Sequence, residues 1–162
     1  MNVVQDIPRY YTALAEWSAC LLYVNLIGGI KKETKNILLA GVFLIVQTGF
    51  LVSTDNVAVY LWIPCMIMAV GLMFGYICLA GQLTIRETGY CCARAFVLAE
   101  FVASLQWQIV SIVQVRGIQS FWTEILITII IFGGCFVIDI YLERDYLKQD
   151  YLQQMTVKEV VA

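Results

Sequence analysis

The chain alternates between five long apolar stretches and short polar segments. The apolar stretches cover about residues 10–30, 36–53, 57–81, 90–114 and 121–142. Each is close to the ~20 residues that an α-helix needs to cross the hydrocarbon core of a bilayer. None shows the alternation of apolar and polar positions that is typical of strands in a membrane β-barrel. The pattern therefore predicts an all-α fold, a bundle of about five transmembrane helices that occupies residues 1–142.

Composition agrees with a membrane protein. Of the 162 residues, 61% are hydrophobic and 14% are charged, whereas a soluble domain has roughly 45–50% apolar and about 25% charged residues. The formal net charge of −2 argues against a nucleic-acid partner, because phosphate binding needs a basic face. The chain has no histidine, so it lacks the commonest metal ligand and general base, as well as a phosphoacceptor histidine. We therefore expect no metal site, no cofactor and no enzymatic activity.

The basic residues between the apolar stretches predict an orientation. Most of them lie in the segments on one side of the expected bundle: Lys31, Lys32, Lys35, Arg86, Arg144, Lys148 and Lys158. Only Arg9 and Arg116 lie on the other side. Since short loops rich in Lys and Arg stay in the cytoplasm, we expect the N-terminus outside and the C-terminus inside. Residues 143–162 are then a helical cytoplasmic tail.

Polar residues inside the apolar stretches are the candidates for function. At about 100° per residue, several side chains of the fourth stretch share roughly one third of the helix circumference, and such a stripe is expected to face protein or water, not lipid. With Glu16 of the first stretch they give the candidate pocket residues Glu16, Glu100, Ser104, Trp107, Gln108 and Ser111. Two interpretations stay open: a ligand pocket or proton path, or hydrogen-bonded contacts that hold helices together. Gln106 lies off the stripe and is expected to meet another helix.

Other residues suggest how the helices pack. Arg94 lies near the expected cytoplasmic end of its helix, where it can reach the interface or a partner elsewhere in the chain. Asp139 and Glu124 fall near the two ends of the fifth stretch and are expected to be solvated. Gly71 and Gly75 form a G-x-x-x-G pair, which lets helices approach closely. That contact is expected within the chain or, alternatively, in a homodimer.

Three segments carry a resemblance to a known family: "IPRYYTALAEWSACLLYV", "YLWIPCMIMA" and "RAFVLAEFVASLQWQ". They resemble the N-terminal membrane region of bacterial GHKL-domain sensor histidine kinases, similar to the peptide receptors of quorum sensing. The A-E-F…W-Q pattern of that region falls here on Ala99, Glu100, Phe101, Trp107 and Gln108. The resemblance implies a sensor module in the bacterial cytoplasmic membrane, a multi-pass protein with a cytoplasmic signalling partner. The kinase's own histidine and ATP-binding domain are not in this sequence.

The sequence thus predicts a membrane sensory or regulatory module. A small ligand or peptide would bind within the membrane region, and the tail would pass the signal to the cytoplasm. An alternative is a small transporter or channel subunit that uses Glu16, Glu100 and Arg94 along its path. That alternative predicts an internal repeat or broken helices, and no clear repeat is present. A packing subunit of a larger membrane complex is a third possibility.

Overall fold

The computed structural model describes residues 7–28, 34–54, 59–81, 83–117 and 120–143. These residues form five α-helices and no strand, which confirms the all-α prediction. The helices are α1 (Arg9–Gly28), α2 (Thr34–Ser53), α3 (Val59–Gly81), α4 (Ile85–Val115) and α5 (Phe121–Glu143). The predicted tail beyond Glu143 lies outside the described residues, as do Lys31 and Lys32.

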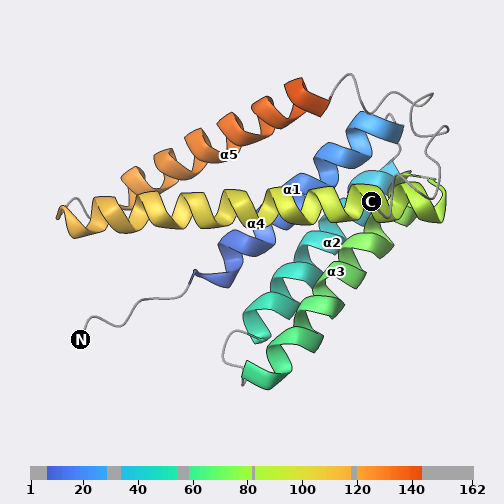
Figure 1. The fold of residues 1–162 in the computed structure, drawn as a ribbon, viewed down its shortest axis with the longest axis horizontal. Helices are drawn as coiled ribbons and strands as arrows, with labels where there is room; N and C mark the ends of the chain where they lie inside the picture. Colours follow the sequence, from blue (N-terminus) through green and yellow to red (C-terminus); the bar gives the residue numbers. More distant parts are fainter. Residues whose placement is uncertain (1–6, 29–33, 55–58, 82, 118–119, 144–162) are drawn as a thin grey trace.

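Successive helices run in opposite directions, and α4 is the longest of them (Figure 1). α3 packs on one side of α4 and α5 on the other, and α2 packs against α1 and α3. α1 packs most extensively against α4 and also against α2 and α3, but has only a small contact with α5. The ends of α1, α3 and α5 and the starts of α2 and α4 therefore come to the same end of the bundle.

Four of the five helices are long and apolar enough to cross a membrane: α2, α3, α4 and α5. The expectation of five apolar spans is thus confirmed for four helices, and α1 is the exception. The burial of α1 explains why. Its fully buried side chains include Ala15, Glu16 and Ala19, so much of the surface of α1 contacts other helices. Positions that contact protein and not lipid can be less apolar.

The contact between α1 and α4 is built on alanines. Ala15 and Ala19 of α1 and Ala95, Ala99 and Ala103 of α4 are at most 1% exposed and belong to one buried cluster. Residues four apart lie on the same face of a helix, so each helix presents a row of small side chains to the other. Small residues at such positions let two helix backbones approach closely in a membrane.

Gly71 and Gly75 do not have this role within the described part of the chain. A Cβ atom added at either glycine would meet no atom within 4 Å. Gly71 is exposed on the outer face of α3, and Gly75 is half-buried. The G-x-x-x-G pair therefore brings none of the five described helices close, and the homodimer alternative stays a prediction.

α4 begins at Ile85, five residues before the predicted start at residue 90. The reason is a capping box that precedes the apolar run. The backbone N–H of Thr84 donates to Glu87 Oε2 at 2.8 Å, and the N–H of Glu87 donates to Thr84 Oγ1 at 3.5 Å. This reciprocal pair satisfies two backbone donors that the helix start leaves free.

Thr84→Ala is expected to lower the free energy of unfolding by about 1 kcal/mol, because it removes the side-chain acceptor at the start of α4. Thermal unfolding of the purified protein in detergent, followed by circular dichroism, measures the change. Ser53→Ala is the matched control, since the Ser53 hydroxyl only donates to a carbonyl in the exposed last turn of α2. Equal effects of the two substitutions would show that the capping box adds no stability.

Candidate functional site

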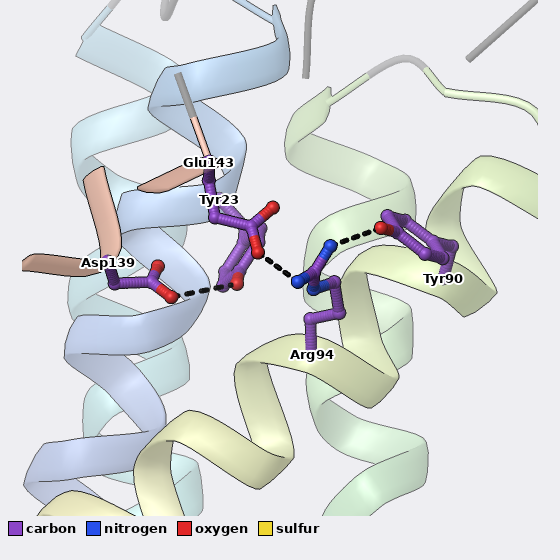
Figure 2. Close-up of polar contacts among 5 residues, drawn as sticks. All are labelled: Tyr23, Tyr90, Arg94, Asp139 and Glu143. Carbon is purple, nitrogen blue, oxygen red and sulfur yellow. Dashed lines mark hydrogen bonds and ion pairs between the residues drawn. The ribbon is translucent and has the colours of Figure 1, made fainter. Parts of the chain in front are cut away.

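A pocket of about 490 Å³ lies where α1, α4 and α5 meet. α1 contributes Tyr23, α4 contributes Tyr90 and Arg94, and α5 contributes Asp139 and Glu143 (Figure 2). The remaining wall is apolar and comes from α4, with Val97, Leu98 and Phe101. The pocket therefore combines a cluster of ionisable side chains with an adjoining hydrophobic surface, an arrangement that is common in sites for small molecules.

Arg94 lies at the centre of the polar cluster. Its guanidinium pairs with the carboxylate of Glu143 and donates a hydrogen bond to the Tyr90 hydroxyl (Figure 2). It also lies over the Tyr90 ring, 5.2 Å from the ring centroid, within the range of a cation–π contact. The side chain of Arg94 is 40% exposed and that of Glu143 is 5% exposed. The ion pair thus joins the outer edge of the pocket to the last residue of α5.

Tyr23 links α1 to α5 in the same cluster. Its hydroxyl donates to Asp139 Oδ1 over a long 3.5 Å, so the bond is weak. Asp139 was expected to be solvated at the interface, but it is half-buried and lines the pocket. The pairing of α5 with both α1 and α4 explains the difference, because it brings Asp139 under the neighbouring helices.

Two carboxyl oxygens of the polar cluster have no donor in the part of the chain that the structure describes. Asp139 Oδ2 and Glu143 Oε2 are buried and accept no hydrogen bond from any described residue. An ionised carboxylate is an acceptor only, whereas a guanidinium offers five N–H donors. Two carboxyl groups thus share one guanidinium, and each has an oxygen that an added donor can pair with. In the described ranges, no three His, Cys, Asp or Glu side chains are grouped to hold a metal ion.

A second polar cluster lies between α1, α2 and α4. Gln47 Nε2 donates to Glu16 Oε2 at 2.5 Å, and both residues are completely buried. Glu100 and Arg9 are close enough to interact electrostatically with Glu16, and Arg9 also interacts with Glu100. Glu16 Oε1, Gln47 Oε1 and Glu100 Oε1 are buried and have no hydrogen-bond partner among the described residues. The structure thus brings the two predicted carboxyl residues near one another, outside the pocket of Arg94.

The other residues of the predicted stripe do not line the pocket of Arg94. Ser104, Trp107 and Ser111 are half-buried along α4, and Gln108 is exposed. Gln106, which was expected to meet another helix, is completely buried and donates to Thr128 Oγ1 of α5 at 3.2 Å.

The polar contacts of α5 were only partly foreseeable. Glu124 is half-buried, and Gln114 Nε2 donates to Glu124 Oε1 at 2.8 Å, a contact that was not predicted. The sequence pointed to Arg94 as a residue that needs a partner, but it did not indicate that Tyr23, Tyr90 and Glu143 lie beside it. The one available signal was an arginine in an apolar helix, which requires a partner.

Comparison with known proteins found no relative. No family model, no curated protein and no solved structure matches the chain. The resemblance to the membrane region of sensor kinases therefore stays a prediction, and function has to be argued from the two polar clusters and the pocket.

Proposed function

We propose that the chain is a membrane sensory or regulatory module whose pocket between α1, α4 and α5 controls the position of α5. The observation that carries the proposal is the ion pair between Arg94 in the pocket and Glu143 at the end of α5. The sequence continues beyond Glu143 with residues 144–162. An occupant that engages Arg94 or Glu143 would thus act on the residue that directly precedes residues 144–162 in the sequence.

The contacts of α5 favour such a movement. At its start, α5 is held to α4 by Gln114 and Glu124, and further along by Gln106 and Thr128. At its other end, the polar contacts among the described residues are the weak Tyr23–Asp139 bond and the Arg94–Glu143 pair. The contact of α5 with α1 is small. An occupant of the pocket can therefore shift the equilibrium between two packings of the α5 end, provided that it binds one packing more tightly.

Orientation supports a cytoplasmic output. Lys35 and Arg86 are exposed at the end of the bundle where α5 finishes, and basic residues favour the cytoplasmic side. We place α1 across the membrane with the other four helices, in a bacterial cytoplasmic membrane, and the end of α5 inside the cell.

The complete burial of Glu16 and Gln47 makes their cluster a less accessible site for a ligand or a transported ion than the open pocket of Arg94.

The proposal predicts that Arg94→Gln loosens the end of α5. A hydrogen bond to a charged group contributes about 1.5–3 kcal/mol, and the partial exposure of Arg94 favours the lower limit. Amides in the last turn of α5 should therefore exchange roughly tenfold faster in the variant. Hydrogen exchange with mass spectrometry, on protein in lipid nanodiscs, measures this rate.

Two further variants make the exchange experiment specific. The charge reversal Arg94→Glu with Glu143→Arg should restore slow exchange, because it rebuilds the pair. Arg116→Gln, at the exposed far end of α4, should leave the end of α5 unchanged. If exchange at the end of α5 is the same in Arg94→Gln and in the unaltered protein, the pocket does not control α5 and the proposal is wrong.

A further inference from the structure

The pocket changes from polar to apolar along α4. Tyr90 and Arg94 lie toward the start of the helix, and Val97, Leu98 and Phe101 follow them. At about 1.5 Å per residue, Phe101 lies roughly 10 Å further along the helix than Arg94. Val97 and Phe101 are 67% and 58% exposed in the isolated chain, so this wall faces the surroundings of the bundle. A membrane helix presents such side chains to acyl chains.

The length of α4 places the polar end at the membrane surface. Its 31 residues span about 46 Å, whereas the hydrocarbon core is about 30 Å thick. Part of α4 therefore extends beyond the hydrocarbon, and Arg86, exposed in the first turn, favours the start of the helix as the part that does. Arg94, roughly 14 Å from the start of the helix, can reach the headgroup level with its long side chain. The pocket thus has its charges at the headgroups and its apolar wall at the acyl chains, as a phospholipid does.

The charges of the pocket fit a headgroup that carries both signs. Glu143 is buried and lines the pocket, and its Oε2 and Asp139 Oδ2 lack donors among the described residues. A primary ammonium supplies N–H donors to both carboxylates. Arg94, with N–H groups beyond its bonds to Tyr90 and Glu143, matches a phosphate.

Other common headgroups fit less well. A quaternary ammonium has no N–H to donate, and a headgroup with a phosphate but no ammonium would bring negative charge beside two carboxylates. We infer that the pocket of Arg94, Asp139 and Glu143 binds the headgroup of a phospholipid with a primary ammonium, taken from the surrounding bilayer. The inference names the occupant of the pocket on which the proposed function rests, so the module would respond to the headgroup composition of its membrane.

Lipid retention measured by native mass spectrometry tests the inference. The protein is released from micelles that contain equal amounts of phosphatidylethanolamine, phosphatidylcholine and phosphatidylglycerol with the same acyl chains. Phosphatidylethanolamine should be retained about tenfold more than the other two, because only its ammonium adds hydrogen bonds to charged groups. Equal retention of the three lipids, or preference for phosphatidylglycerol, would overturn the inference.

Variants assign the binding to the pocket. Asp139→Asn should abolish most of the preference over phosphatidylcholine, and Arg94→Gln should reduce retention of all three lipids. Arg116→Gln should retain the full preference. Circular dichroism checks that each variant is folded, and the conservative Asp139→Asn keeps the test decisive if Arg94→Gln does not fold. An unchanged preference in folded Asp139→Asn would place the lipid elsewhere and contradict the inference.

Soluble phosphoethanolamine distinguishes a lipid from a free metabolite with the same headgroup. It should not displace the bound lipid at equal concentration, because it lacks the chains that contact Val97 and Phe101. Displacement at equal concentration would contradict the bilayer as the source.

Hydrogen exchange of Arg94→Gln, measured in nanodiscs of phosphatidylethanolamine or phosphatidylcholine, separates this inference from the proposed function when it is compared with lipid retention. Selective retention with no effect of Arg94→Gln on α5 exchange would support the lipid site and refute control of α5. Faster exchange of α5 in Arg94→Gln without selective retention would support control of α5 and refute the lipid site.

Discussion

Ala99→Leu is expected to lower the free energy of unfolding by about 3 kcal/mol, the upper part of the usual range for overpacking a buried site. Ala99 is completely buried in the cluster that joins α4 to α1. The added carbon atoms cannot be accommodated unless the two helices move apart, and that movement would loosen the largest helix contact of the bundle. Thermal unfolding in detergent, followed by circular dichroism, measures the loss.

Gly71→Leu is the matched control for the overpacking test. It adds the same side chain to another small residue in an apolar helix, but no atom lies within 4 Å of the new Cβ position. We expect a change below about 0.5 kcal/mol, as for other surface positions. If Gly71→Leu destabilises the protein as much as Ala99→Leu, the outer face of α3 is packed, and the apparent mass of the protein–detergent complex would then show whether a second copy covers it.

Gln47→Leu is expected to cost about 2 kcal/mol. It removes a hydrogen-bond donor from Glu16, and an unsatisfied buried polar group costs about 1–3 kcal/mol. Both residues are completely buried, so water cannot readily replace the lost donor. The midpoint of thermal unfolding in detergent reports the effect.

The double variant Glu16→Leu with Gln47→Leu should be nearly as stable as the unaltered protein. Replacing both partners of a buried polar contact by apolar groups of similar shape can be close to neutral. A double variant that is less stable than Gln47→Leu alone would show that Glu16 has a further stabilising contact. Recovery of stability would support the second interpretation of Glu16, a contact that holds α1 to α2.

The helices could be predicted from the sequence because each apolar run is long and continuous. The runs at residues 121–142 and 36–53 match α5 and α2 to within two residues at either end. The start of α4 was missed because its signal is chemical, not hydrophobic. Thr84 and Glu87 are polar residues in front of the apolar run, and a threonine followed three positions later by a glutamate is the signature of a capping box.

The packing contacts were harder to predict. The G-x-x-x-G pair of α3 was the evident small-residue motif, yet the close contact uses alanines four residues apart, at Ala95, Ala99 and Ala103. Alanine is so common in apolar helices that its spacing has little predictive weight. Only the fold shows which row of small residues faces another helix.

The candidate site shows the same limit. An arginine within an apolar helix indicates a partner, and Arg94 was identified for that reason. Its partner Glu143 is 49 residues away in the chain, and Tyr23 and Asp139 are 116 residues apart. Such pairs depend on which helices become neighbours. The sequence therefore indicated that Arg94 needs a partner but did not place it in a pocket, and the tertiary structure was needed to find the pocket.

The modest apolarity of α1 has a consequence for biogenesis. α1 is made before α4, the helix that it contacts most. A segment with Glu16 near its middle and Arg9 at its start is retained weakly by lipid alone, since charged residues oppose release from the translocon into the bilayer. We expect α1 to settle in the membrane only after α2 has supplied Gln47 and α4 has supplied its alanines. In the assembly of this bundle, α1 would then be synthesised first but would take its final position only after the later, lipid-facing helices have packed against it.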